Sequence, residues 1–289
     1  MKKLFLCLLM LLYCAAMAVA EEAEMVTYTE GAYEYILTDE GAVLTSWNWY
    51  TDGYVVPEVV ELPAELGGQT VVGIGYNALN TSEMYDEETF TLIVPEGVKW
   101  LDKVAFQCCH NADVVYIPAS LTEIPEACFH HVGAEIIVAE DNPRFAVQSG
   151  YLIDTKTDTL IYSQPTTCGT ALPTVRRIGK SSLDNWHNWE MKAVFPAGVQ
   201  EIGAYVLQDT LLTSLTLPDG LLLIEEEAIC GEIMQPVTIP ASVQLIQRGN
   251  FTDPGNTIIL LNEATHFETA NEYETRTGYR HWTDYWPEE

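Results

Sequence analysis

Residues 115–129 read VYIPASLTEIPEACF, and this stretch decides the fold. Val115 and Ile117 alternate with a tyrosine immediately before Pro118. Apolar residues at every second position are typical of a β-strand that turns one face toward a core. Proline suits the end of such a strand because it has no N–H to donate to a longer ladder. The stretch therefore begins with a short, half-buried strand.

A second apolar motif follows the proline. Leu121 and Ile124 are three residues apart, and Phe129 lies five residues after Ile124, directly behind the small Cys128. A small residue lets a turn approach a neighbouring layer closely, and the large one behind it can enter a shared core. The stretch therefore reads as one layer of a stacked structure.

The strand-and-proline motif occurs seven times along the chain. Four of the six intervals between its prolines are nearly equal, at about 22 residues each, and the other two are longer. The long intervals, from Pro63 to Pro95 and from Pro118 to Pro173, predict insertions into an otherwise regular repeat. The prolines are Pro63, Pro95, Pro118, Pro173, Pro196, Pro218 and Pro240.

The pair of a small and a large residue recurs in the same register. Seven large apolar residues in register have a chance of about one in a hundred when half of all residues are apolar. A coil this short cannot bury its own apolar side chains, whereas stacked coils share a core. The sequence therefore predicts a solenoid. The pairs are Ala78-Leu79, Ala105-Phe106, Cys128-Phe129, Ser182-Leu183, Val206-Leu207, Ala228-Ile229 and Asn250-Phe251.

Stacking predicts a continuous sheet and two covered ends. Residues 28–54 alternate as an N-terminal hairpin with its turn at residues 39–41, and the segment from residue 257 is expected to close the other end. The strands expected side by side in one parallel sheet, about 4.8 Å apart, lie at residues 92–94, 115–117, 215–217 and 237–239.

The repeat resembles the BspA-like leucine-rich repeat family, whose pattern is matched by residues 115–129. Residues 66–75, LGGQTVVGIG, are similar to the opening that commonly precedes the first full repeat. The long interval is similar to the usual insertion of that family, with DNPRF at 141–145, GYLID at 150–154 and LIYSQP at 160–165. The resemblance covers about residues 26 to 265 in order and spacing.

This resemblance implies a mainly β fold, a leucine-rich-repeat solenoid of seven to eight coils with a length of about 22–23 residues each, with short helical turns and an N-terminal β-hairpin cap. The resulting domains are a signal peptide at 1–20, an N-terminal cap at 21–57, a solenoid at 58–256 with an insertion at about 139–168, and a C-terminal cap or tail at 257–289.

The first twenty residues predict export. Two lysines precede the apolar run at residues 4–13, and Ala18-Val19-Ala20 supplies the small residues that signal peptidase requires. An uncleaved membrane anchor is the alternative, but the run is shorter than the roughly 20 residues that span a bilayer. Lipidation at Cys14 is disfavoured by the bulky Tyr13 before it. We expect a secreted or surface-bound protein with no membrane insertion after cleavage.

Composition excludes several partners. The 289 residues carry 13 Lys+Arg against 42 Asp+Glu, a formal net charge of −29, while 48% of residues are apolar. The apolar share fits a folded chain, and the charge repels nucleic acid and anionic lipid. We expect a monomer that contacts an extracellular protein or glycan.

A cysteine- and histidine-rich corner raises the question of metal. Cys108, Cys109 and His110 fall in one coil, and Cys128, His130 and His131 fall in the next. Zinc takes such ligands, but the spacing matches no compact zinc module. The favoured interpretation is core thiols beside loop histidines, with no metal or other cofactor. Accordingly, Cys128 and Cys230 are expected to be buried and reduced.

Two aromatic groups are candidates for ligand contact. Trp186, His187 and Trp189 surround an asparagine in a lengthened turn, and residues 47–50 read WNWY. Tryptophan beside polar side chains suits the stacking of sugar rings. The alternative is that the residue 47–50 group packs the N-terminal cap and the other group fills its turn.

No catalytic motif is present. The chain lacks G-x-S-x-G, H-E-x-x-H and a phosphate-binding glycine loop. We therefore predict a non-catalytic exported protein that presents a solenoid surface for protein or glycan binding, or adhesion. An accessory to a carbohydrate-active enzyme and a purely structural spacer are the alternatives.

Overall fold

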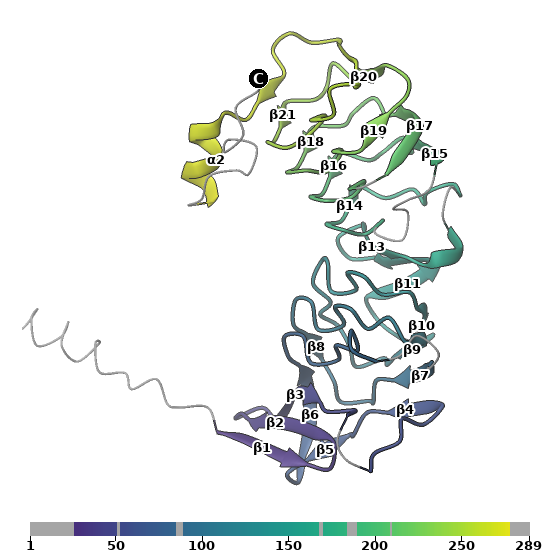
Figure 1. Cartoon of the computed structure of the whole chain (residues 1–289), viewed down its shortest axis with the longest axis vertical. Helices are drawn as coiled ribbons and strands as arrows, with labels where there is room; N and C mark the ends of the chain where they lie inside the picture. The colour runs from purple at the N-terminus through teal and green to yellow at the C-terminus, as the bar shows by residue number, and fades with distance from the viewer. Residues whose placement is uncertain are drawn as a thin grey trace, which may run out of the picture.

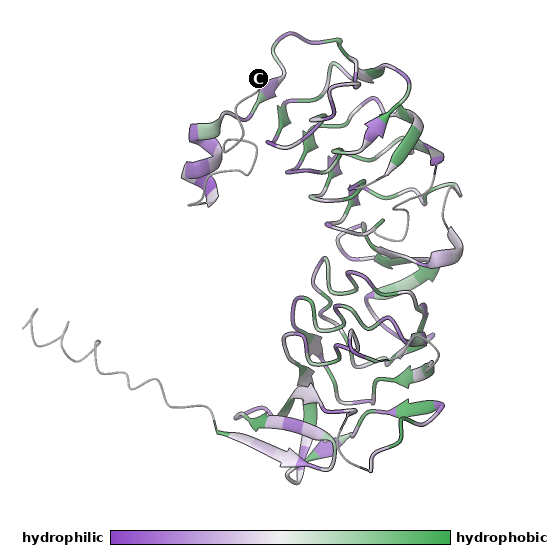
Figure 2. Ribbon diagram, in the orientation of Figure 1, coloured by the Kyte–Doolittle hydropathy of each residue, from purple (hydrophilic) through white to green (hydrophobic). Residues whose placement is uncertain are grey.

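The computed structural model describes residues 26–50, 53–84, 89–167, 170–183, 190–208 and 210–277. The chain is an arc of stacked coils, with short strands along its concave side and longer strands along its convex side (Figure 1). Strands β4, β7 and β17 of the convex side are mostly hydrophobic, whereas the C-terminal helix is mostly hydrophilic (Figure 2). The solenoid and the mainly β fold predicted from the repeat are confirmed.

An antiparallel meander forms the N-terminal end. Strands β2 and β3 pair around residues 38–41, where the sequence predicts a turn, and β3 then pairs in parallel with β6 of the first coil. The meander is therefore joined to the solenoid by a continuous ladder. The strands of this sheet are β1 (Thr27–Glu30), β2 (Tyr33–Leu37), β3 (Ala42–Trp47), β5 (Glu65–Leu66), β6 (Gln69–Ile74) and β8 (Trp100–Leu101).

Four parallel strands form the first convex sheet, in the order β10-β9-β7-β4. Leu92 lies opposite Val115 and Val115 lies opposite Ile136, so the ladder follows the repeat. The pairing predicted between residues 92–94 and 115–117 is thus present. The strands are β4 (Val59–Glu61), β7 (Phe90–Ile93), β9 (Ala112–Ile117) and β10 (Glu135–Val138).

The prediction of a single sheet through residues 215–217 and 237–239 is wrong. The convex side continues as two further sheets, and Leu215 and Val237 fall in different ones. Pro236 stands directly before β20 and has no N–H with which to continue the ladder. The strands are β15 (Glu190–Val194), β17 (Leu211–Thr216) and β19 (Glu232–Ile233) in one sheet, and β20 (Val237–Ile239) and β22 (Ile258–Leu260) in the other.

The second apolar motif is itself a strand, which the sequence did not indicate. Ile178, Ile202, Ile224 and Ile246 lie opposite one another in a parallel ladder that continues across the break at Pro236. This ladder holds the coils together. Its sheet contains β11 (Phe145–Gln148), β12 (Tyr151–Asp154), β13 (Thr159–Ser163), β14 (Arg177–Ile178), β16 (Glu201–Ile202), β18 (Leu223–Ile224), β21 (Leu245–Ile246) and β23 (His266–Phe267).

A left-handed residue shapes the turn of every coil. It lies three positions after the second apolar residue, and the described turns are consequently not α-helical. A left-handed backbone conformation is strained for the β-branched Val104. At the equivalent position of the last coil stands Gly249, which adopts this conformation without strain. The φ values are Asn77 54°, Val104 55°, Ala127 63°, Ser181 52°, Tyr205 60°, Glu227 49° and Gly249 81°.

The large residue of each small-and-large pair is buried, from Leu79 at 0% exposed to Phe251 at 9%. The shared column predicted from the sequence is therefore confirmed. Asn250 is the one small partner that is half-buried. Its side chain donates to Gln247 O in its own coil and to Glu225 O in the preceding coil, and it accepts the Ile229 N–H of that preceding coil.

The insertion is a wall between two cores. Strands β12 and β13 are buried along their whole length. Leu152 and Tyr162 pack into the core of the N-terminal half, whereas Tyr151 and Leu160 pack into that of the C-terminal half. Alternation along β12 sends Tyr151 and Leu152 to opposite faces, and a bulge in the pairing sets Tyr162 opposite Leu152 and Leu160 opposite Ile153, so one hairpin serves both cores. The insertion is a structural part of the solenoid.

Helix α2 (Ala270–Thr277) ends the described chain beside the concave side of the last coils (Figure 1), and a single turn of 3-10 helix, η1 (Pro165–Thr167), follows β13. Thr269 caps α2, since its N–H donates to Glu272 Oε2 and its hydroxyl accepts the Glu272 N–H. Tyr273 is 8% exposed and donates to Glu226, which fixes the helix against the solenoid. Among the described helices, none has the length and apolar character of a membrane span.

Candidate functional site

The predicted ligand residues Trp186, His187 and Trp189 lie outside the described residues. The two tryptophans of the group at residues 47–50 pack against the cap, as in the alternative interpretation, whereas Tyr50 is 68% exposed. Trp47 is 2% exposed and meets Phe90 edge to face, with ring centroids 5.2 Å apart. Trp49 is half-buried, and its indole N–H donates to Asn80 O at 3.3 Å.

In the cysteine- and histidine-rich corner, two of the thiols are packed into the core. Cys109 and Cys128 are fully buried, and the four described cysteines form no disulfide with one another. Among residues that the structure describes, no three His, Cys, Asp or Glu side chains are grouped to hold a metal ion. The prediction that Cys230 is buried is wrong, because it is half-buried at the end of its turn.

Thiol titration should separate these cysteines. Burial raises the pKa of the Cys109 and Cys128 thiols to about 12, so almost no thiolate is present near neutral pH. In mature Cys168→Ser protein, residues 21–289, four cysteines are left, and we expect DTNB to leave Cys109 and Cys128 unmodified until denaturant is added, while Cys230 reacts in the folded state. Cys128→Ala should remove one of the slow thiols. Four rapidly reacting thiols in native buffer would contradict the burial.

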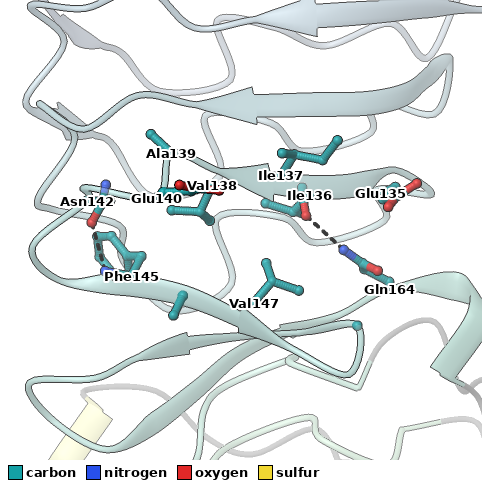
Figure 3. A pocket seen from close by; sticks show the side chains of 12 residues that line it. Glu135, Ile136, Ile137, Val138, Ala139, Glu140, Asn142, Phe145, Val147 and Gln164 are labelled. Carbon is teal, nitrogen blue, oxygen red and sulfur yellow. Dashed lines mark hydrogen bonds between the residues drawn. The ribbon is translucent and has the colours of Figure 1, made fainter.

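A groove of about 480 Å³ opens between β10 and β11 (Figure 3), two strands that lie near the middle of the arc (Figure 1). The chain reverses between these strands, so Ala139 and Phe145 lie at one end of the groove (Figure 3). Strand β10 is the last strand of the four-stranded sheet, and β11 is the first of the eight-stranded sheet. The groove is thus bordered by two sheet edges.

Strand β10 turns alternate backbone groups into the groove. Ala139 N–H donates to Ile117 O in β9, at 2.9 Å. Because N–H and C=O groups alternate in direction along a strand, Ile136 and Val138 must direct theirs away from β9. Gln164 confirms this direction, since its Nε2 reaches across the groove to Ile136 O at 2.9 Å.

Strand β11 presents its own edge in the same way. Thr155 N–H donates to Arg144 O on the side of β12, so Phe145 and Val147 direct their backbone groups toward β10. Asn142 Oδ1 accepts the Phe145 N–H at 2.8 Å. Among the described residues, Gln164 and Asn142 are the side chains that bond to these edge groups.

The closed end of the groove is held rigidly by Asn142. Its Nδ2 donates to Pro118 O and Leu121 O, at 2.8 and 2.9 Å, and its Oδ1 accepts the N–H groups of Arg144 and Phe145. One side chain therefore ties the loop to the preceding coil and sets the separation of the two edges.

The lining is apolar in the floor and acidic at the rim. Ile136 and Phe145 are 1% and 2% exposed, whereas Val147 is half-buried. Glu135 and Glu140 are exposed and stand near opposite ends of β10. This arrangement can take an extended apolar segment with positive charge at its ends.

On the concave side of the same junction, ion pairs close the interface between the two halves. Arg144 donates from Nε and Nη2 to Asp154 Oδ2, at 3.1 and 2.8 Å. Arg177 forms a two-bond pair with Glu126 and a further bond to Glu225. These arginines border a cavity of about 330 Å³, but their guanidinium groups already have partners, so the cavity is structural.

The carboxylates of these pairs are held ionised. Burial raises the pKa of Asp154, but hydrogen bonds from Arg144, Thr157 and the Lys156 N–H outweigh it and hold the pKa below its ordinary value. Burial likewise raises the pKa of Glu126, and bonds from Arg177 and the Lys180 N–H lower it further than burial raises it.

Sequence reasoning missed the groove. It predicted an insertion at about residues 139–168 but gave no signal that β10 and β11 expose edges to each other, since pairing partners depend on how the inserted hairpin docks. The nearest signal is Asn142 before Pro143, a combination typical of a fixed turn.

Several solved structures are similar to this chain. The pneumococcal vaccine antigen PcpA is 13% identical, covers 86% of this chain and 90% of its own, and has a TM-score of 0.42. A leucine-rich repeat protein from Eubacterium ventriosum is 15% identical, with coverage of 86% and 74% and a TM-score of 0.42. A leucine-rich cell surface protein from Faecalibacterium prausnitzii is 14% identical, with coverage of 86% and 97% and a TM-score of 0.35.

No curated protein matches the chain. The model of the BspA type leucine rich repeat region matches it in six copies, over residues 69–143 and 170–270. These residues are more than half of the chain, and they contain the concave strands β8, β14, β16, β18, β21 and β23. The chain therefore belongs to the BspA-type leucine-rich repeat family.

Proposed function

We propose that this chain is an exported, non-catalytic binding module that holds an extracellular protein partner in the groove between β10 and β11. Export rests on the predicted signal peptide at residues 1–20. The observation that carries the proposal is the pair of sheet edges facing each other across an open groove. Edges are usually paired, covered or blunted, and an open one is a natural place for another chain to bind.

The surroundings support a protein partner. The groove has an apolar floor that can bury apolar side chains of a partner and an acidic rim that favours basic ones. Its rigid closed end gives it a defined shape. The solenoid positions them on a scaffold with two packed cores. Glycan binding through Trp186, His187 and Trp189 stays a prediction, as does a role as a spacer or enzyme accessory.

An array experiment tests the proposal. Mature protein, residues 21–289, is applied to an array of extracellular-matrix proteins, serum proteins and glycans. We expect binding to at least one protein, and loss of that binding in Ala146→Trp, because Ala146 lines the groove and an indole there fills it. Ala197→Trp is the matched control, since Ala197 is exposed on a turn outside the groove lining.

Two results would contradict the proposal. One is an array on which the mature protein binds no protein. The other is equal binding by Ala146→Trp and Ala197→Trp when both variants unfold at the same urea concentration as the parent. Binding to glycans alone, lost on Trp186→Ala or Trp189→Ala, would favour the alternative site.

A further inference from the structure

We propose that the ligand of the groove is an extended peptide segment of the partner, carrying lysine or arginine at its ends, which pairs as an added strand with the edge of β10. This inference rests on the proposed function and names its ligand. Three features of the groove support it. They are the backbone N–H and C=O groups that β10 directs into the groove, the position of Gln164, and the negative charge at the rim of the groove.

The backbone groups select a polypeptide main chain. Ile136 and Val138 direct N–H and C=O groups into the groove at the two-residue spacing of a strand edge. Only another extended main chain presents donors and acceptors at that spacing over several residues. Addition of a strand to an exposed edge is a common mode of peptide recognition, in which backbone bonds supply affinity and alternate side chains supply specificity.

Gln164 shows that a planar amide fits at this edge. Its side chain is a primary amide, chemically close to a peptide group, and its Nε2 donates to Ile136 O at 2.9 Å. Gln164 is 6% exposed and also lines the groove. It therefore occupies one position of the ladder that a peptide would fill, and a bound strand would replace it there while continuing to Val138.

The charge and the apolar lining of the groove indicate which residues the bound peptide segment carries. Glu135 and Glu140 stand near opposite ends of β10, so basic residues at both ends of a peptide find opposite charges. Half-buried Val138 and Val147 pack against the core, so they offer contact to apolar side chains. A second copy of this chain is disfavoured as the occupant, because each copy carries a net charge of −29.

The probe is the peptide Ac-KVTVTVK-NH2, which alternates apolar and polar residues between lysines. Binding to the mature protein is measured by calorimetry, and hydrogen exchange at residues 136–138 is followed with and without the peptide. We expect binding together with slowed exchange of the Val138 N–H. A peptide with glutamate at both ends, Ac-EVTVTVE-NH2, and a peptide with prolines in place of the threonines should bind at least about tenfold more weakly.

The decisive variant is Val138→Pro. It removes an N–H that faces the groove and leaves the bonds from β10 to β9 intact, because proline is tolerated where the N–H of an edge strand points outward. Val138→Ala is the matched control, since it loses a similar part of the side chain but keeps the N–H. We expect Val138→Pro to weaken binding of Ac-KVTVTVK-NH2 about tenfold relative to Val138→Ala.

Equal affinity of Val138→Pro and Val138→Ala would overturn strand pairing, as would equal binding of the proline-containing peptide. If an array protein binds and Ala146→Trp abolishes that binding, but the two Val138 variants are equal, the groove binds a partner without an added strand. The proposed function would then stand and this inference would fail.

Discussion

Phe129→Ala should lower the free energy of unfolding by about 3–5 kcal/mol, because it removes a buried ring and leaves a cavity that its surroundings cannot fill. Phe129 is 3% exposed. Its ring centroid lies 5.1 Å from that of Phe106 in the preceding coil and 5.4 Å from that of Tyr162 in the insertion. Tyr162 is fixed by bonds from its hydroxyl to Val132 O and Ala134 O, so it is held away from the vacated space.

Urea unfolding, monitored by circular dichroism, measures this loss. Phe267→Ala is the matched control, because Phe267 is 42% exposed at the C-terminal end of the solenoid and should lose less than about 1 kcal/mol. A shift below about 1 kcal/mol for Phe129→Ala would mean that the stacked column does not stabilise the junction of the two halves.

Asp154→Ala should cost about 3 kcal/mol at neutral pH, since it removes one partner of an ion pair at the interface of the two halves. The Asp154 side chain is 4% exposed and that of Arg144 27%. The carboxylate also accepts the N–H groups of Lys156 and Thr157, so the change frees donors in the β12–β13 turn as well. Asp113→Asn, at an exposed position in β9, should change stability by less than about 0.5 kcal/mol.

The same pair predicts a pH dependence. The native state holds the pKa of Asp154 below its ordinary value, so the carboxylate stabilises the fold at any pH above the unfolded pKa of about 4. This stabilisation is lost as the pH falls through the lower, folded-state pKa. The stability difference between the parent and Asp154→Asn should therefore be constant from pH 7 to about 5 and shrink below about 4. A difference that grows on acidification would contradict the assignment.

The two-residue strands of the concave ladder illustrate a limit of sequence reasoning. The pairs Leu223/Ile224 and Leu245/Ile246 carry no period-2 signal of their own, because two residues are too few to show alternation. Their strand geometry comes from the stack, since each coil places its pair beside the same pair of the next coil.

Repeat, register and buried column were determined by the sequence alone. Each depends on residues within one coil and on a spacing of about 22 residues, and the same local solution recurs along the chain. Large residues such as Leu79, Phe129 and Ile229 could therefore be assigned to the core without coordinates. The family resemblance rests on the same spacing, and the repeat model matches residues 69–143 and 170–270.

Only the tertiary structure decided where the solenoid departs from its repeat. The convex sheet breaks at Pro236, the insertion becomes a wall between two cores, and β10 has a hydrogen-bonded partner strand on only one side among the described strands. Each of these depends on how segments distant in sequence dock, as when Gln164 reaches Ile136. Local periodicity determines which side chains turn inward. Whether the edge of a strand is left unpaired depends instead on where the other strands of the folded chain lie.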